Sequence, residues 1–167
     1  MFNECNLEIC GWSKRLKKRF CFVLAAVLFP MSVSAGVYVK DGDSLSLNGR
    51  EIRLLGIDAP EYRQVCDDAS GREYDCGEKA KDYLKSLVKG KKVSCRKIAV
   101  DIYKRELSKC YAGKTYLNRK MLEAGWAVVY RSKNKRYKEW ENEARENKRG
   151  MWQGKFMRPE LHRILNK

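Results

Sequence analysis

Two short segments of the chain place carboxylates near an arginine. In the first, Asp41 and Asp43 flank a glycine, and in the second, Arg53 is followed by Asp58 and Glu61. Carboxylate oxygens bind hard cations such as Ca²⁺, an ionised glutamate can orient or deprotonate a water molecule, and a guanidinium holds a phosphate through parallel hydrogen bonds. Together these residue types predict metal-assisted cleavage of a phosphate ester.

Each segment also has a purely structural interpretation. Asp-Gly is a common turn dipeptide, and an EF-hand loop starting at Asp41 is excluded because its fifth and twelfth positions hold leucine and isoleucine. Arg53 is less easily explained as structure, since alternation along an apolar strand places it on one face with Leu55 and Ile57. A guanidinium on such a face needs an anion, because its burial is otherwise costly.

Composition narrows the range of chemistry and of partners. The chain has 167 residues, 44% of them hydrophobic, which suits one domain with a core of its own. It has 36 Lys and Arg against 21 Asp and Glu, so the formal net charge is +15, and the expected partners are polyanions such as nucleic acid, anionic lipid or acidic polysaccharide. Because His162 is the only histidine, Ser-His-Asp hydrolases, two-histidine ribonucleases and histidine-rich zinc sites are disfavoured.

The first 35 residues have the pattern of a secretory signal peptide. Basic residues at 14–19 precede an apolar run at 20–29, and residues 33–35 form a site for cleavage after Ala35. An uncleaved membrane anchor is the alternative, but a bilayer core needs ~20 apolar residues and this run is shorter. Cleavage removes five basic and two acidic residues and leaves a mature domain, residues 36–167, with a net charge of +12. We expect the protein to be exported to the periplasm or the medium, without stable membrane association.

Four cysteines remain in the mature domain, and an even number in an exported chain indicates disulfides. If residues 101–104 form a hairpin turn, residue 100 lies opposite residue 105, and Cys95 lies opposite Cys110, close enough for a disulfide. Cys66 and Cys76 then pair across a polar loop. A zinc site is the alternative interpretation, but the chain has no CxxC spacing.

Apolar periodicity predicts strands first and helices later. Strands are expected at residues 37–40, 45–47, 51–57, 93–98 and 106–112. Asn48-Gly49 is a strong two-residue hairpin signal, and residues 59–77 are expected to form a loop. Helices are expected over 78–90, about 117–124 and about 135–149. The fold class is α+β, and five short strands with three helices fit a small closed β-barrel of the OB type.

Four linked motifs resemble those of the staphylococcal nuclease (thermonuclease) family. They are VKDGDSLSL, IRLLGIDAPE, DIYKRELSKCY and YLNRKMLEAGWAVVY, and the resemblance covers residues 37 to about 153. Any single motif is weak evidence, whereas the combination is specific. The resemblance implies a five-stranded OB barrel with three helices. It also implies a calcium-assisted endonuclease that hydrolyses phosphodiester bonds of DNA and RNA.

The resemblance assigns a metal site to the first acidic residues. By motif position, Asp43 and Asp58 would bind Ca²⁺ through their carboxylates, with the backbone carbonyl of Ala59 beside them. Asp41 would support this site from just outside it. An oxygen-only ligand set of this kind suits calcium better than zinc.

The resemblance also assigns catalytic and nucleotide-binding roles. Glu61 would be the general base or the carboxylate that positions the attacking water, and Arg53 and Arg105 would bind the phosphate. Tyr103 and Tyr130 match tyrosines that border the nucleotide pocket. Contacts to phosphates rather than to base edges predict little sequence specificity.

The chain departs from the family pattern at two of these positions. Ala59 stands where the family usually has threonine, which is tolerable if only its carbonyl meets the metal. Lys104 stands where the family commonly has glycine, and a positive φ at that position would strain a lysine and affect the placement of Arg105. The segment CDDASGREYDC is absent from the type member of the family but resembles exported bacterial relatives.

Two other functions are compatible with a basic OB fold. One is a catalytically inactive module that binds single-stranded nucleic acid through basic and aromatic residues. The presence of three carboxylates beside arginines argues against it, because binding alone does not require them. The other is a cationic protein that acts on membranes or cell-wall polymers, for which the chain has no basic amphipathic helix with a wide apolar face. The sequence therefore favours a nuclease over both alternatives, and we expect this nuclease to be a monomer.

Overall fold

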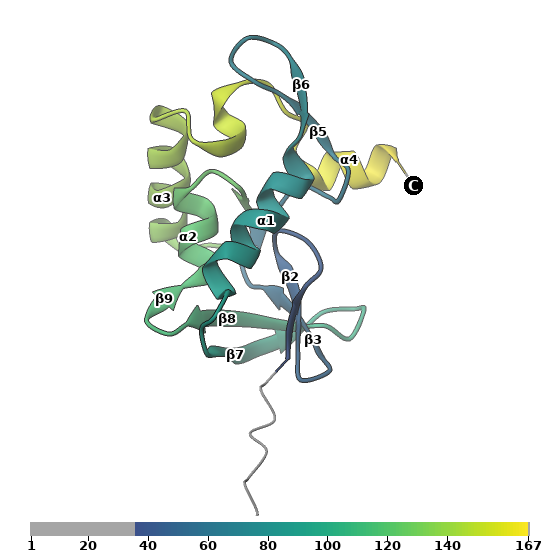
Figure 1. Ribbon diagram of the computed structural model, residues 1–167, viewed down its shortest axis with the longest axis vertical. Helices are drawn as coiled ribbons and strands as arrows, with labels where there is room; N and C mark the ends of the chain where they lie inside the picture. The colour runs from purple at the N-terminus through teal and green to yellow at the C-terminus, as the bar shows by residue number, and fades with distance from the viewer. Residues whose placement is uncertain (1–35, 167) are drawn as a thin grey trace, which may run out of the picture. The chain divides into compact units, whose positions relative to one another are not determined.

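The structure is a computed structural model that describes residues 36–166 (Figure 1). The predicted signal peptide lies outside the described residues, as do Cys5, Cys10 and Cys21, so cleavage after Ala35 stays a prediction. In the described part of the chain, no helix has the length and apolar character needed to cross a membrane.

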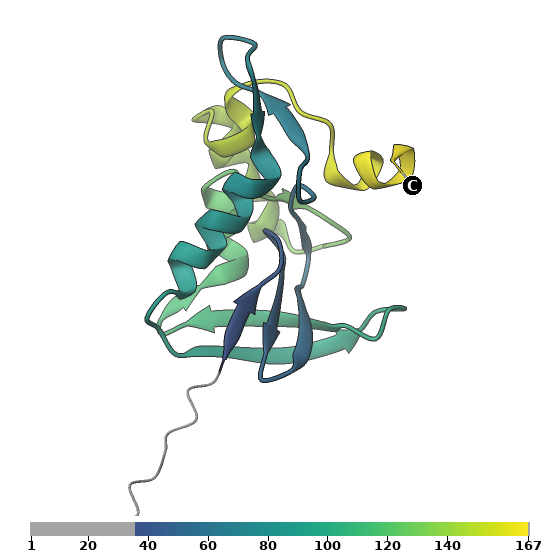
Figure 2. The same ribbon diagram turned by 45° about the vertical axis from the view of Figure 1, so that its right-hand side comes forward.

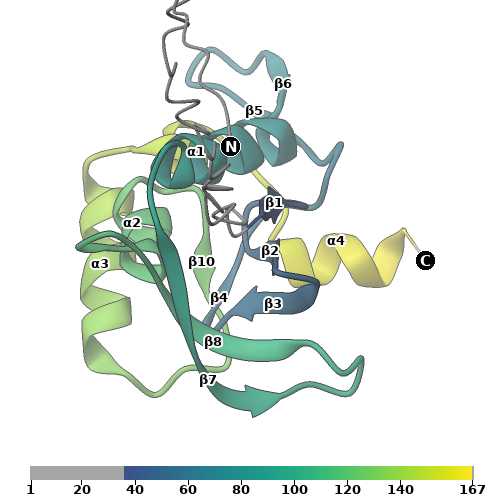
Figure 3. The ribbon, with the colours of Figure 1, turned by 60° about the horizontal axis from the view of Figure 1, so that its bottom comes forward.

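A curled sheet forms a half-barrel at the centre of the described domain (Figure 3). Its strands are β1 Val37–Val39, β2 Ser44–Leu47, β3 Arg50–Leu54, β7 Val93–Val100, β8 Glu106–Ala112 and β9 Thr115–Tyr116. They lie in the order β1-β2-β3-β8-β7, and β9 pairs with β8. All neighbours are antiparallel except β3 and β8, which are parallel. The expected strands are therefore present, but among the described residues no pairing of β1 with β7 closes a barrel.

Four α-helices and a 3-10 turn complete the described fold, where the sequence predicted three helices. They are α1 Cys76–Val88, α2 Leu117–Glu123, α3 Lys135–Glu146, the 3-10 turn η1 Gly150–Gln153, and α4 Pro159–Leu165. The additional helix is α4, whose first residue is a proline with the φ that a first helical turn requires. Figures 1 and 2 show α4 on the side of the domain away from α3.

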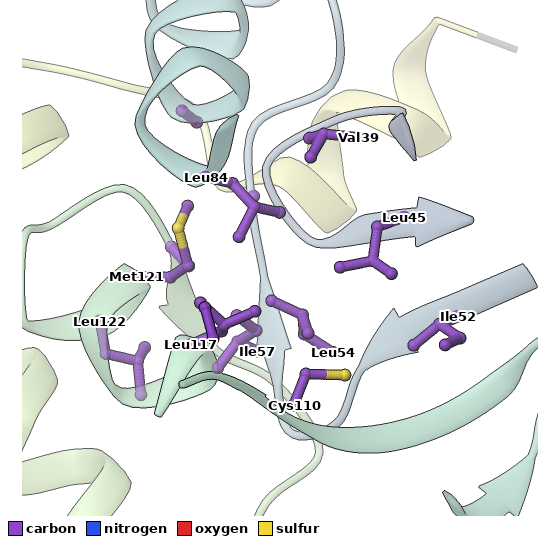
Figure 4. Close-up of a cluster of buried hydrophobic side chains, with 14 of the residues drawn as sticks. Val39, Leu45, Ile52, Leu54, Ile57, Leu84, Cys110, Leu117, Met121 and Leu122 are labelled. Atoms are coloured by element: carbon purple, nitrogen blue, oxygen red, sulfur yellow. The ribbon is translucent and has the colours of Figure 1, made fainter. Parts of the chain in front are cut away.

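The inner face of the sheet and the first two helices enclose the hydrophobic core. Alternate residues of β2 and β3 point inward, so Leu45, Ile52 and Leu54 are fully buried. Figure 4 shows them in one cluster with Leu84 of α1 and Met121 of α2. Removal of these side chains from water supplies the main favourable free energy for joining sheet and helices.

The strand predicted over residues 51–57 is broken into two. Gly56 has a φ of 80°, a left-handed conformation that glycine adopts without steric cost, and the chain turns there. After the turn, the short strand β4 Ile57–Asp58 leaves the main sheet and pairs with β10 Val128–Val129. This pairing joins segments about seventy residues apart, so it could not be predicted from local periodicity.

The segment 59–77, predicted to be a loop, contains a small hairpin. Its strands are β5 Val65–Asp67 and β6 Glu73–Asp75, which pair antiparallel. The hairpin is short and polar, so it lacks the alternation that marks a half-buried strand. The disulfide Cys66–Cys76 joins β5 to the first residue of α1, as the sequence predicted.

The β7–β8 hairpin has a different register from the predicted one near its turn. Val100 lies opposite Glu106 rather than residue 105, because the turn is one residue longer. A bulge between Lys97 and Ala99 then shifts the register back. Cys95 and Cys110 are consequently opposite each other and joined by a disulfide, so the predicted pairing is confirmed although the expected turn is wrong.

We predict that replacing Lys104 with glycine stabilises the protein. Lys104 has a φ of 63°, which costs a side-chain-bearing residue about 1–2 kcal/mol, while glycine loses about 0.5–1 kcal/mol more backbone entropy on folding. The free energy of unfolding of Lys104→Gly should therefore rise by about 0.5–1 kcal/mol in urea titrations. Lys104→Ala is the control, since alanine keeps the strain. Equal stability of the two variants would contradict a strained turn.

Candidate active site

Arg53 of β3 joins Asp43 and Asp58 in one ion-pair cluster. Its Nη2 lies 2.8 Å from Oδ2 of Asp43 and 2.5 Å from Oδ1 of Asp58. Both aspartates are buried, and the Arg53 side chain is only 11% exposed. Two buried carboxylates repel each other, and a guanidinium shared between them offsets that repulsion. Arg53 thus meets anions, as its place on an apolar strand predicted.

Hydrogen bonds to Asp41, Ser44 and Ala59 fix the position of Asp43 at the end of the β1–β2 turn. Asp41 accepts a hydrogen bond from the Asp43 N–H through Oδ1, at 3.0 Å. Asp43 in turn accepts from the Ser44 hydroxyl, at 2.7 Å, and from the Ala59 N–H, at 3.1 Å. A Cβ on Gly42 would lie 2.7 Å from the Ala59 Cβ, so only glycine allows this close approach. The turn is therefore shaped to bring Asp43 against the segment that follows Asp58.

Asp58 is positioned by the β4–β10 pair and by a glutamate that sequence analysis missed. Val128 of β10 lies opposite Asp58, and the next residue, Val129, donates its N–H to Oε1 of Glu141 at 2.8 Å. Glu141 is fully buried on α3 and also binds Lys138 at 3.1 Å. Glu141 follows the buried Tyr137 by four residues, so both lie on the face of α3 that points to the core. This helical spacing is the sequence feature from which the burial of Glu141 could have been predicted.

Glu61 lies on a loop that is held in place by contacts with Gln64 and Gly77. The buried Gln64 accepts from the Glu61 N–H at 3.2 Å and donates to the Met157 carbonyl at 2.7 Å. Gly77 packs so closely that a Cβ there would lie 1.8 Å from the Glu61 carbonyl oxygen. Because Gly77 follows the disulfide residue Cys76, the β5–β6 hairpin and its disulfide support the loop that presents Glu61.

Arg163 of α4 completes the cluster, although it lies beyond every motif. Its Nη1 is 2.5 Å from Oε1 of Glu61 and 2.9 Å from Oδ1 of Asp58, and its Nη2 is 2.9 Å from Oδ2 of Asp58. Asp58 and Arg163 are 105 residues apart. No local sequence signal connects them, so only the tertiary structure shows this contact.

The contacts that the structure shows for Arg105, Tyr103 and Tyr130 are with residues outside the cluster. The Arg105 Nε is 2.8 Å from Oδ2 of Asp101, and its guanidinium lies over the Tyr103 ring. Tyr103 is 70% exposed, and the Tyr130 N–H bonds to the Gly56 carbonyl. In the described part of the chain, Arg105 makes no ion pair with the carboxylates that bind Arg53, so its phosphate-binding role stays a prediction.

A family model described as "Staphylococcal nuclease homologue" matches residues 51–154. The chain belongs to the staphylococcal nuclease family. An "Uncharacterized endonuclease" of Escherichia coli is 38% identical over 123 residues, which cover 70% of this chain and 74% of the relative. A "Succinoglycan biosynthesis protein" of Rhizobium meliloti is 32% identical over 139 residues, which cover 78% and 73%. A "Probable endonuclease" of Saccharomyces cerevisiae is 34% identical over 122 residues, which cover 65% and 43%. The family and these endonucleases support nuclease activity.

Burial shifts the pKa values of the two aspartates in the candidate site. Burial raises the pKa of Asp43 to about 6, although the Arg53 guanidinium acts in the opposite direction. Burial also raises the pKa of Asp58, and the nearby Asp43 adds to that rise against the hydrogen bond from Arg163. The charged forms of both carboxylates therefore depend on positive charge close to them.

The carboxylate oxygens of Asp43 and Asp58 suit a hard cation if the guanidinium groups of Arg53 and Arg163 move away from them. In the described residues, no three Asp, Glu, His or Cys side chains stand together as a ready metal site. Oxygens of Asp43 and Asp58 nevertheless approach one nitrogen of Arg53, so they converge on a common point. Their ligand atoms are oxygens alone, the type that calcium prefers over zinc.

We predict that Gly77→Ala impairs nuclease activity without unfolding the protein. The added methyl group would displace the Glu61 carbonyl, and a shift of about 1 Å in a catalytic group can cost ~10²-fold in rate. Turnover on plasmid DNA, with folding checked by circular dichroism, measures the effect. Gly36→Ala is the matched control, since nothing lies within 4 Å of its added methyl group. Normal turnover of folded Gly77→Ala would show that this packing does not position Glu61.

Proposed function

We propose that the protein is an exported, calcium-dependent endonuclease that hydrolyses phosphodiester bonds of DNA and RNA with little sequence specificity. The observation that carries the proposal is the cluster of Asp43, Asp58 and Glu61 around the guanidinium groups of Arg53 and Arg163. Placing the Glu61 carboxylate beside the buried carboxylates of Asp43 and Asp58 costs free energy, and a protein that only binds nucleic acid has no use for this arrangement. The alternative of an inactive single-strand-binding module is therefore disfavoured.

Asp43, Asp58 and the carbonyl of Ala59 are the residues that would hold Ca²⁺. Both aspartates already lie within 3 Å of one Arg53 nitrogen, and Asp41 and Ser44 hold Asp43 in place. Bound calcium would polarise a phosphoryl oxygen and stabilise the negative charge that develops during cleavage. Export agrees with the two disulfides, which persist in oxidising compartments.

Glu61 would act on the attacking water, and the arginines on the phosphate. The ionised carboxylate of Glu61 can accept a proton or orient the water for attack on phosphorus. The guanidinium groups of Arg53 and Arg105 would stabilise charge on the phosphoryl oxygens through paired hydrogen bonds. Tyr103 and Tyr130 would border the nucleotide. Since these contacts are to phosphate and not to base edges, the enzyme should accept many sequences.

We predict that Glu61→Gln keeps the fold and substrate binding but lowers turnover by ~10²–10⁴-fold, because glutamine cannot accept the proton. A plasmid-nicking assay with calcium, and with chelator as the blank, measures turnover. Glu73→Gln is the matched control, since Glu73 is an exposed glutamate of the β5–β6 hairpin. The proposed function fails if the wild-type protein nicks neither DNA nor RNA with calcium. The assigned role of Glu61 fails if folded Glu61→Gln turns over normally.

A further inference from the structure

The outer face of β8 begins beside Arg53 and runs along the sheet away from it. In the parallel β3–β8 pair, Arg53 lies opposite Leu107, so their side chains share a face. Because alternate residues of a strand share a face, Lys109 and Tyr111 follow Leu107 on that side of β8. The intervening residues, Ser108, Cys110 and Ala112, are buried in the core. The outer row of β8 therefore leads from the phosphate-binding arginine toward the far end of the sheet.

The strands on either side of β8 widen this row. Arg96 of β7 lies opposite Lys109, and Tyr116 of β9 lies opposite Tyr111. The Tyr111 and Tyr116 rings are stacked, with centroids 4.9 Å apart, and Tyr111 is 39% exposed. We call Arg96, Lys109, Tyr111 and Tyr116 the β8 track. It combines two cations with an accessible aromatic surface.

The chain segments that contain the four residues of the β8 track carry charge of one sign. Every charged residue in segments 83–100 and 107–122 is basic. In the described residues, neither Arg96 nor Lys109 takes part in an ion pair, whereas most acidic side chains near the catalytic cluster are paired. A surface of unpaired cations is complementary to a polyanion.

We propose that the β8 track is a binding path for single-stranded nucleic acid that extends from the catalytic site. The proposal rests on the proposed nuclease function and adds the part of the substrate that lies beyond the cleaved bond. At ~3.4 Å per residue, Tyr111 lies ~14 Å from Leu107 along β8, which leaves room for several nucleotides. An exposed Tyr111 ring can stack on an unpaired base, whereas the bases of a duplex are already stacked on each other.

The test compares a short and a long oligonucleotide in a protein that binds without cleaving. In the Glu61→Gln background, fluorescence anisotropy would measure the affinity for oligothymidylates of about 3 and about 12 nucleotides. Tyr111→Ala should weaken binding of the long oligonucleotide at least ~5-fold because it removes the stacking surface, while Tyr111→Phe should not. Neither variant should change binding of the short one.

Charge is tested separately through the salt dependence of binding. Arg96→Gln with Lys109→Gln should make the slope of log affinity against log salt shallower by ~1.4, because each phosphate that a cation neutralises contributes ~0.7 to that slope. Lys148→Gln with Lys155→Gln removes the same charge from exposed positions after α3 and should leave the slope unchanged.

The outcomes separate this proposal from the proposed function. If the wild-type protein cleaves nucleic acid but the track variants bind both oligonucleotides like their controls, the β8 track is not a binding path. The same anisotropy assay with a DNA duplex of about 12 base pairs tests the occupant. If the track variants lose affinity for this duplex and for the single strand equally, the assigned single-stranded occupant is wrong. If the wild-type protein neither binds nor cleaves nucleic acid, the nuclease function itself fails.

A second inference comes from Arg163, independently of the sheet. Its guanidinium binds both oxygens of Asp58, and the oxygens of Asp43 accept from Arg53, Ser44 and Ala59. The aspartates proposed to hold the cation therefore have their oxygens engaged by donors of the protein itself. A divalent cation that binds Asp58 must first displace Arg163.

The helix that carries Arg163 is weakly held. Pro159 is the buried residue of α4, and Leu161, Ile164 and Leu165 are exposed. The segment before the helix is fastened, since Gln64 donates to the Met157 carbonyl and Arg158 donates to the Val129 carbonyl at 3.2 Å. An element with few buried contacts opens at low free-energy cost, so α4 can swing about this fastened segment.

We infer that α4 is an autoinhibitory element, in which Arg163 competes with the catalytic cation for Asp58 and Glu61. This inference also rests on the proposed metal site. Competition is reciprocal: if Arg163 weakens cation binding by some factor, the cation weakens docking of α4 by the same factor. Calcium would thus release α4 as it enters the site.

Isothermal titration calorimetry with calcium alone tests the competition. Arg163→Gln should bind calcium ~10-fold more tightly than the wild type, within the usual range of coupling between sites. Arg131→Gln is the matched control, because it removes an exposed guanidinium that lies near Glu160 of α4. Amide hydrogen exchange of residues 160–165 should become faster when calcium is added to the wild type.

Unchanged or weaker calcium binding by Arg163→Gln would overturn the inference, as would exchange in α4 that calcium leaves unaltered. An equal increase in affinity in Arg131→Gln would also overturn it, because the effect would then be general electrostatics. The absence of calcium binding in every variant would instead contradict the proposed metal site.

Discussion

The burial of Asp43 and Asp58 side by side is the constraint on which this structure depends. Removing a carboxylate from water costs several kcal/mol, and two neighbouring carboxylates also repel each other. Arg53 offsets this cost by contacting both, and N–H and hydroxyl donors from Ala59 and Ser44 satisfy the remaining oxygens of Asp43. Two segments of chain must therefore meet at one point with little tolerance. The glycine at position 42 and the β4–β10 pair are consequences of that requirement.

The same constraint explains why parts of the fold remote from the chemistry are closely packed. Glu141 has no contact with the carboxylates, yet it holds β10, and β10 holds the strand that ends in Asp58. Gln64 and the Cys66–Cys76 disulfide act in the same way on the loop that presents Glu61. A catalytic carboxylate that is displaced by ~1 Å loses much of its effect. Supporting contacts of this kind are therefore part of the site.

Charge differs in sign between the candidate site and two stretches of the chain. The carboxylates of Asp43 and Asp58 lie where β2, β3 and β4 meet, while segments 83–100 and 107–122 carry only basic charged residues. A polyanionic substrate is attracted by the basic surface and repelled by bare carboxylates, so the acidic cluster needs cations of its own. Arg53, Arg163 and the proposed calcium meet that need in different states of the site. A net positive domain can in this way contain an acidic centre.

The residues that form the candidate site and much of its local geometry could be predicted from the amino-acid sequence. Asp43, Arg53, Asp58 and Glu61 stand in short motifs, and the strand that carries Arg53 shows the alternation of a half-buried sheet. The pairing of Cys95 with Cys110 also followed from the spacing across one hairpin. All of these features depend on residues close together in the chain, where periodicity and turn chemistry are informative.

The distant partners of these residues became visible only in the folded domain. Arg163 meets Asp58 across 105 residues, and Glu141 reaches the strand β10 from another helix. The polar β5–β6 hairpin and the bulge in β7 were likewise absent from the local patterns. Such contacts form because the packed core brings chain segments together, and the free energy that selects them comes from the whole domain. Local sequence patterns therefore do not reveal which distant segments of the chain will meet.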